Sequence, residues 1–146
     1  MFTDQQTIVP DVLRKQRLAT VRPQDTVRAA SRLMAKRKIG AVLVIKGALL
    51  VGIFTERDVL VRVVAAGLDP DRTPLAEVMT PDPDVIGGDS TVRDALDMMH
   101  ERGYRHLPVL HRKRLTGIVS IRDLYGSVTQ QMESDILLLA EGLLHN

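Results

Sequence analysis

The sequence predicts an α+β fold in which two β-α-β-β-α motifs pack about a pseudo-two-fold axis, with an extended C-terminal helix. Three observations lead to this prediction. The chain has 146 residues, 45% hydrophobic and 26% charged, as expected for a soluble domain that buries a core. The second half of the chain repeats the first. Within each repeat, the spacing of hydrophobic residues changes from helical to strand-like in the same order.

The repeat appears when the sequence is shifted by 65 residues. Residues 26–28 (Thr-Val-Arg) then align with residues 91–93, and the alignment continues without a gap. Of the 35 positions from 26 to 60, 12 are identical in the two copies. A repeat at a fixed offset indicates that one structural unit occurs twice in the chain.

Each copy begins with an amphipathic helix, predicted at residues 26–38 and 91–102. In the first of these, Val27, Ala30 and Met34 recur at helical spacing behind a polar start, and the second keeps the same pattern. Basic residues collect in the last turns, where they favour the negative end of the helix dipole.

Short β-branched segments flank these helices. The predicted strands span residues 18–21, 41–45 and 50–54 in the first copy and residues 84–86, 107–110 and 115–119 in the second. Polar turns at residues 46–47 and 111–114 join the last two strands of each copy into a hairpin. A second helix follows each hairpin, at residues 56–66 ending at Gly67, and from residue 121 onward.

Hydrophobic residues continue at helical spacing beyond the second motif. They are Tyr125, Val128, Met132, Ile136, Leu139 and Leu143. Their average spacing of 3.6 residues predicts one helix that runs to Leu144. An exposed hydrophobic stripe of this kind requires a partner, so we expect a homodimer and an effector protein that the sequence does not identify.

The pattern divides the chain into three parts. Residues 1–74 hold the first motif with an N-terminal segment and a linker, and residues 75–128 hold the second motif after a short helix at 75–79. Residues 129–146 form the helical extension. Neither motif buries enough hydrophobic area to be stable alone, so we expect the two to pack sheet against sheet.

Composition excludes several classes of function. The chain has no cysteine, which excludes disulfides, thiol nucleophiles and thiolate metal sites, and which fits a cytoplasmic location. No hydrophobic run approaches the roughly 20 residues of a membrane span, and residues 1–10 lack the pattern of a signal peptide. The net charge of +2 names no partner.

Metal binding, catalysis and nucleic-acid binding are all disfavoured. The histidines do not share a helical face, so no metal site is expected; they are His100, His106, His111 and His145. No nucleophile with a neighbouring base is apparent, so we expect no enzymatic activity and no required cofactor. Stacking of nucleic-acid bases needs more aromatic rings than the four present. These are Phe2, Phe54, Tyr104 and Tyr125.

The most informative element is Gly-Ile-x-Thr/Ser-x-Arg-Asp, which occurs in both copies where a strand meets a helix. Its residues are Gly52, Ile53, Thr55, Arg57 and Asp58, and again Gly117, Ile118, Ser120, Arg122 and Asp123. The carboxylate can accept hydrogen bonds from a ribose, while the hydroxyl and the helix N-terminus can donate to a phosphate. The alternative is structural, because a hydroxyl residue followed three positions later by an acid also caps a helix.

With this motif in both copies, the chain resembles a stand-alone pair of cystathionine-beta-synthase (CBS) domains, a Bateman module. The resemblance covers about Val9 to Val128. It also rests on the two Thr-Val-Arg-x-Ala helix starts, on residues 77–80 (Glu-Val-Met-Thr) and on residues 105–109 (Arg-His-Leu-Pro-Val). It implies clefts between paired motifs that bind adenosine-containing ligands such as AMP, ADP, ATP, S-adenosylmethionine or NADH.

The resemblance also implies roles for individual residues. The resemblance assigns ribose contacts to Asp58 and Asp123. It assigns ribose or phosphate contacts to Thr55, Ser120, Arg57 and Arg122. The residues expected to line the adenine pockets are Thr20, Val21, Ile39, Gly40, Ala41, Val42, Val85, Ile86, Tyr104, Leu107 and Pro108.

Phosphate recognition is expected to be asymmetric between the copies. Arg105 and His106 are placed to contact phosphate, whereas Gly40 and Ala41 stand at the matching positions of the first copy. In the alternative interpretation, His106 is an ordinary hairpin residue and Arg105 is solvated.

Three functions follow as hypotheses. The first is a non-enzymatic regulatory module that binds an adenine nucleotide as its regulatory ligand. The second is a scaffold that uses the same fold for dimerisation or partner docking and leaves its clefts empty. The third is a nucleic-acid binder that uses short basic clusters such as residues 36–38 and 112–114.

Overall fold

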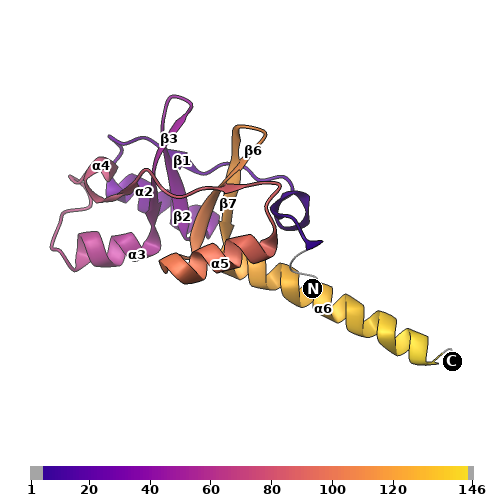
Figure 1. Ribbon diagram of the computed structural model, residues 1–146. Helices are drawn as coiled ribbons and strands as arrows, with labels where there is room; N and C mark the ends of the chain where they lie inside the picture. The colour runs from indigo at the N-terminus through magenta and orange to yellow at the C-terminus, as the bar shows by residue number, and fades with distance from the viewer. Residues whose placement is uncertain (1–4, 145–146) are drawn as a thin grey trace.

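The computed structural model describes residues 5–144, and its strands form two sheets whose hairpins stand side by side (Figure 1). The first sheet has the order β1 (Thr20–Val21), β2 (Ala41–Lys46), β3 (Leu49–Thr55) and β4 (Thr80–Pro81). The second has the order β5 (Ile86–Gly87), β6 (His106–His111) and β7 (Arg114–Ser120). In both, the first strand is parallel to the second and the hairpin is antiparallel. The predicted α+β fold is confirmed.

The helices follow the repeat. Those of the first copy are α2 (Val27–Arg37), α3 (Glu56–Asp58) and the π-helical segment η2 (Val59–Val64), followed by α4 (Leu75–Val78). Those of the second copy are α5 (Val92–Arg102) and α6 (Ile121–Leu144), and a π-helical turn η1 (Ile8–Val12) precedes both copies. Figure 1 shows that the C-terminal part of α6 extends well beyond the sheets, as the hydrophobic spacing predicted.

Several predicted boundaries are wrong by one or two residues. β1 begins at Thr20 instead of residue 18, because the Leu18 carbonyl accepts a hydrogen bond from the Arg37 guanidinium (3.1 Å) instead of from a strand. β5 starts at Ile86 instead of residue 84, and the pairing continues beyond it through the hydrogen bond from Gly88 N–H to the Leu110 carbonyl.

The helix predicted at residues 56–66 and the two hairpin turns also need correction. Only Glu56–Asp58 is α-helical, and the rest is wound more widely, with the Ala65 N–H donating to the carbonyl of Leu60 five residues earlier. The second turn contains two residues instead of four, because Arg112 and Lys113 both adopt positive φ angles, the geometry of a tight two-residue hairpin turn. The first turn is likewise confined to residues 47–48.

Strand β4 was not predicted. It pairs with β3 through Gly52 and Ile53, which lie opposite Pro81 and Thr80. A Cβ atom at Gly52 would collide with the side chain of Met79, so the glycine allows this segment to cross closely over β3. Gly117 does the same in β7, where a Cβ atom would collide with the side chain of Gln16. The repeated glycine is therefore explained by packing.

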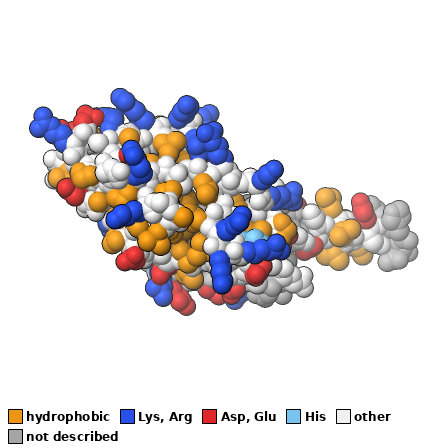
Figure 2. Space-filling view, turned by 90° about the horizontal axis from the view of Figure 1, so that it is seen from above, with side chains coloured by type: hydrophobic (Ala, Val, Ile, Leu, Met, Phe, Trp, Pro, Cys, Tyr) orange, Lys and Arg blue, Asp and Glu red, His pale blue; other side chains and the backbone are white. Residues whose placement is uncertain are grey.

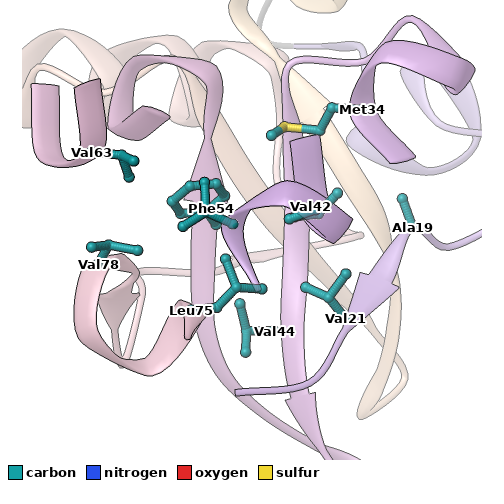
Figure 3. Close-up of a cluster of buried hydrophobic side chains, with 11 residues drawn as sticks. Ala19, Val21, Met34, Val42, Val44, Phe54, Val63, Leu75 and Val78 are labelled. Atoms are coloured by element: carbon teal, nitrogen blue, oxygen red, sulfur yellow. The ribbon is translucent and has the colours of Figure 1, made fainter. Parts of the chain in front are cut away.

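Three hydrophobic clusters hold the structure together. The first lies between the sheet of the first copy and its helices, and Figure 3 shows Phe54 within it, near Val63 and Val78. The second is its counterpart in the second copy, around Leu107 and Leu124. The third joins the two copies: Ala41, Leu43 and Ile53 are buried, with Leu18, Leu50, Leu115 and Ile118 packed against them. The expected packing of sheet against sheet is therefore present.

The first two clusters cross the predicted division of the chain at residue 74. Leu75 and Val78 of α4 belong to the cluster of the first copy, and Ile8 and Leu13 of the N-terminal segment belong to that of the second. This N-terminal segment, residues 8–18, then runs back to β1 of the first sheet. The part boundaries stay predictions, and their ends at residues 1–4 and 145–146 lie outside the described residues.

The N-terminal segment should contribute measurably to stability. Ile8 is fully buried in the cluster of the second copy, so Ile8→Ala should lower the free energy of unfolding by about 2–5 kcal/mol. Leu49→Ala, which removes the same number of carbon atoms at a position that is 66% exposed, should change it by no more than about 0.5 kcal/mol. Urea denaturation followed by circular dichroism measures both. Equal effects of the two substitutions would contradict the assignment of Ile8 to the core.

Candidate functional site

The repeated motif lies where each hairpin ends and the next helix begins. The Asp58 N–H donates to Thr55 Oγ1 (3.2 Å), and Asp58 Oδ2 accepts from the Thr55 N–H (2.9 Å). The second copy repeats this reciprocal cap, since the Asp123 N–H donates to Ser120 Oγ and the Ser120 N–H donates to Asp123 Oδ2, both at 3.0 Å. Both aspartates therefore cap their helices, as the structural alternative proposed. Each cap uses only the Oδ2 oxygen of the carboxylate.

A cleft of about 950 Å³ opens between the two copies. From the sites predicted in the sequence, the structure brings to this cleft Ile39, Gly40, Ala41, Arg105, His106, Ser120, Arg122 and Asp123. The first three come from the start of the first hairpin, and the others come from the second copy. The cleft thus combines part of the predicted adenine pocket of one copy with predicted ribose and phosphate residues of the other.

Backbone hydrogen bonds fix the walls of the cleft. The Glu56 N–H donates to the carbonyl of Gly40 (3.0 Å), and the Ile121 N–H donates to the carbonyl of Arg105 (2.9 Å). In each copy, the start of the hairpin is thereby tied to the start of the helix that follows it. These two matching pairs lie on either side of the pseudo-two-fold axis.

The remaining predicted residues do not line this cleft. They are Thr20, Val21, Val42, Thr55, Arg57, Asp58, Val85, Ile86, Tyr104, Leu107 and Pro108. Val21 and Val42 are buried in the cluster of the first copy, and Ile86 and Leu107 in that of the second. Because side chains alternate along a strand, the side chains of these four residues point into the cores and not into this cleft, and the assignment of their strands to adenine pockets stays a prediction. Ala41 faces the other sheet, so its neighbour Val42 faces the helices.

Several lining residues were not predicted, and Gln16, Arg17 and Glu56 are the polar ones that matter most. Glu56 occupies a variable position of the repeated motif, where the second copy has Ile121, so the repeat alone gave no reason to select it. Gln16 reaches the cleft from the N-terminal segment: its Nε2 donates to the Ile118 carbonyl (3.2 Å) and its Oε1 accepts from the Ile118 N–H (2.8 Å). No local pattern indicates such a long-range contact.

At Gly40 the first copy approaches the second closely within the cleft. A Cβ atom at this position would lie 3.1 Å from both Glu56 Oε1 and His106 Nε2. Burial lowers the pKa of His106, and the negative charges of Glu56 and Asp123 partly oppose this shift. The imidazole is therefore subject to the charge of two carboxylates that come from different copies.

Positive charge surrounds the same cleft. Arg17, Lys38, Arg105 and Arg122 line it from four different segments, and each is exposed. Within residues 5–144, none of the four forms an ion pair with a carboxylate. The cleft can therefore offer unpaired cations to a negatively charged ligand, since charge-assisted bonds to phosphate are strong.

Residues 5–144 contain no group of three or more His, Asp or Glu side chains placed to hold a metal ion, and His145 lies outside this range. None of the helices in this range is long and hydrophobic enough to cross a membrane.

Comparison with known proteins identifies CBS domains in both copies. A family profile described as "CBS domain" matches residues 9–65 and 75–129. The chain is 36% identical over 106 residues to the CBS domain-containing protein CBSCBSPB3 of Arabidopsis thaliana, which covers 73% of this chain. It spans only 18% of the length of that relative.

Solved structures resemble the whole arrangement. A putative signal-transduction protein with CBS domains from Burkholderia ambifaria superimposes with a TM-score of 0.79 and 35% identity, covering 84% of this chain and 93% of its own. The CBS domain protein PAE2072 of Pyrobaculum aerophilum, solved in complex with AMP, has a TM-score of 0.71 and 27% identity, covering 81% of this chain and 88% of its own.

The surroundings of His106 predict how it titrates. Its pKa should lie below the ordinary value of 6.5, and Glu56→Gln should lower it further because a nearby negative charge is removed. Below pH 6.5 the unfolded chain then binds a proton that the folded protein does not, so stability should fall as the pH decreases towards the pKa of the folded state. Proton NMR titration, with His106→Gln to assign the signal, measures the midpoint. A midpoint at or above 6.5 would contradict the predicted effect of burial.

Proposed function

The chain belongs to the CBS-domain family, and from this premise we propose that it is a non-enzymatic regulatory module whose cleft binds an adenosine-containing nucleotide. The observation that carries the proposal is the composition of the cleft. One wall has small and aliphatic side chains, Ala19, Ile39 and Ala41, which suit a flat base. The opposite wall has Asp123 and several cations, which suit a ribose and phosphates.

We propose that Asp123 binds the ribose. Its Oδ2 atom accepts from the Ser120 N–H, and no described hydrogen-bond donor occupies Oδ1. A free carboxylate oxygen at the edge of a cleft can accept from ribose hydroxyls. The reciprocal cap supports this role, because it holds the carboxylate in one position before a ligand arrives.

We propose that Arg105, Arg122 and His106 bind the phosphates. Arginine is permanently charged and can donate two parallel hydrogen bonds, which suits phosphate oxygens. The charges of Glu56 and Asp123 act on His106, and its imidazole becomes a second charged donor when it is protonated. Among the relatives, the AMP complex of the Pyrobaculum protein supports an adenine nucleotide as the ligand class. AMP, ADP, ATP, S-adenosylmethionine and NADH remain the candidates.

A docking scaffold with an empty cleft is the second candidate function. The exposed hydrophobic side chains of η2 and α6 favour protein contacts, and they do not depend on a nucleotide. The effector protein is unidentified. Nucleic-acid binding through the basic clusters and a cytoplasmic location remain predictions from the sequence.

A nucleotide screen tests the proposal. AMP, ADP or ATP should raise the melting temperature, and Asp123→Asn should weaken binding about ten- to a hundred-fold, as expected for the loss of a charged hydrogen-bond partner. Arg105→Ala should reduce the affinity for AMP more than that for adenosine, because only AMP carries a phosphate. Arg114→Ala, an exposed arginine outside the cleft, is the matched control. Isothermal titration calorimetry measures each affinity.

The proposal fails if no nucleotide changes the melting temperature, a result that would favour the scaffold. Equal losses of AMP and adenosine binding in Arg105→Ala would mean that Arg105 shapes the cleft without contacting phosphate.

We also propose that the protein forms a homodimer through its exposed hydrophobic surfaces. In Figure 2, hydrophobic side chains stand out on the projecting part of α6. Ile136 and Leu139 are 62% and 69% exposed there, and Leu60 of η2 is 62% exposed. On α6, four successive hydrophobic side chains at residues 136–139 are exposed, and exposed hydrophobic surface of this kind often marks a contact with another protein.

Light scattering tests the homodimer. The parent should have the mass of two chains at micromolar concentration. Ile136→Asp should weaken association at least ten-fold, because it buries a charge in the contact. Ser134→Asp places the same charge on the opposite side of α6 and should leave the mass unchanged. A monomeric parent would contradict the proposal.

A further inference from the structure

The two copies differ at the positions that would form equivalent clefts. Ala19 and Ile39 line the open cleft, and 65 residues later the chain has Asp84 and Tyr104. The Tyr104 hydroxyl donates to Asp84 Oδ2 (2.9 Å), and Arg102 Nη1 contacts the same oxygen (3.1 Å). We call Tyr104, Asp84 and Arg102 the tyrosine cluster.

The tyrosine cluster is held in place from two sides. The Tyr104 ring packs against the hydrophobic core of the second copy. Burial, followed by the hydrogen bond to Asp84, raises the pKa of Tyr104 to about 12. The phenol therefore stays protonated and continues to donate to Asp84 at physiological pH. A large ring and an ion pair thus occupy positions that are filled by Ile39 and Ala19 in the open cleft.

Asp58, the predicted ribose carboxylate of the first copy, already has partners within the protein. Asp58 Oδ2 accepts from the Thr55 N–H (2.9 Å) and from the Thr55 hydroxyl (3.1 Å), and Oδ1 lies 3.4 Å from Arg62 Nε. Arg62 also donates to the carbonyls of Val78 (3.2 Å) and Met79 (3.0 Å), so it is anchored beside the carboxylate. Both oxygens of Asp58 therefore have partners within the protein.

Among residues 5–144, no lysine or arginine forms an ion pair with Asp123. The position that corresponds to Arg62 is Ser127, so the arginine that engages Asp58 has no counterpart in the second copy. The two clefts therefore differ in both walls. The open cleft has Ala19 and Ile39 on one wall and a free oxygen of Asp123 on the other. The matching cleft is filled by Asp84 and Tyr104, and its carboxylate, Asp58, is occupied.

We infer that the chain binds one nucleotide instead of two, because the tyrosine cluster closes the second cleft and Arg62 occupies its ribose carboxylate. This inference rests on the proposed nucleotide function and specifies which half of the duplicated site performs it. Tyr104 and Arg62 then determine stoichiometry, although neither touches the bound ligand.

Calorimetry with AMP, and with ATP as a second probe, tests the inference on the parent protein. We expect one ligand per chain, a ten- to a hundred-fold loss of affinity in Asp123→Asn, and parent affinity in Asp58→Asn. Two ligands per chain, with one lost in Asp58→Asn, would overturn the inference and leave the proposed function intact. Absence of binding by either probe would overturn the proposed function itself.

Exchange of residues between the copies provides the second test. The triple variant Arg62→Ser, Asp84→Ala and Tyr104→Ile gives the closed cleft the residues of the open one at the three positions to which closure is assigned, and it should bind a second ligand per chain. The reciprocal double variant Ala19→Asp and Ile39→Tyr should lose the single site. Circular dichroism establishes that each variant is folded. A folded triple variant that still binds one ligand, or a folded double variant with parent affinity, would overturn the assignment of closure to these residues.

Discussion

The packing of one hairpin against the other is the contact on which the rest of the structure depends. Ala41, Leu43 and Ile53 of the first sheet bury their side chains together with Leu115 and Ile118 of the second. Because the start of one hairpin strand lies beside the end of its partner, this contact brings both hairpin starts and both following helix N-termini to one end of the molecule. The cleft is a direct consequence, since neither copy alone supplies both of its walls.

Duplication followed by divergence explains the asymmetry of the site. The reciprocal caps of Thr55 with Asp58 and of Ser120 with Asp123 are retained, because each stabilises a helix start whether or not a ligand binds. The side chains around the caps have no such structural constraint. These side chains are Tyr104 and Arg62 on one side and Ile39 and Ser127 on the other. Retention of the motif therefore marks the fold more reliably than it marks a second ligand site.

The sequence was sufficient for features that depend on local patterns. Hydrophobic periodicity located the helices α2, α5 and α6 and both hairpins within one or two residues, because these elements bury a continuous face. Strand β4 and the position of Gln16 depend on a chain segment crossing over another copy, and no local pattern records such a contact. The side chains of Val42 and Leu107 are buried in the two cores, and their place in an adenine pocket stays a prediction, because family resemblance identifies a strand and not which side of it faces a ligand.

The central claim is that a single ligand contacts both copies at once. Amide chemical-shift mapping by NMR during a titration with AMP measures this directly. The account predicts that the amides of Gly40 and Ala41 in the first copy and of Ser120 and Asp123 in the second shift together, with one shared dissociation constant. Shifts confined to one copy, or two sets of shifts with different dissociation constants, would contradict it.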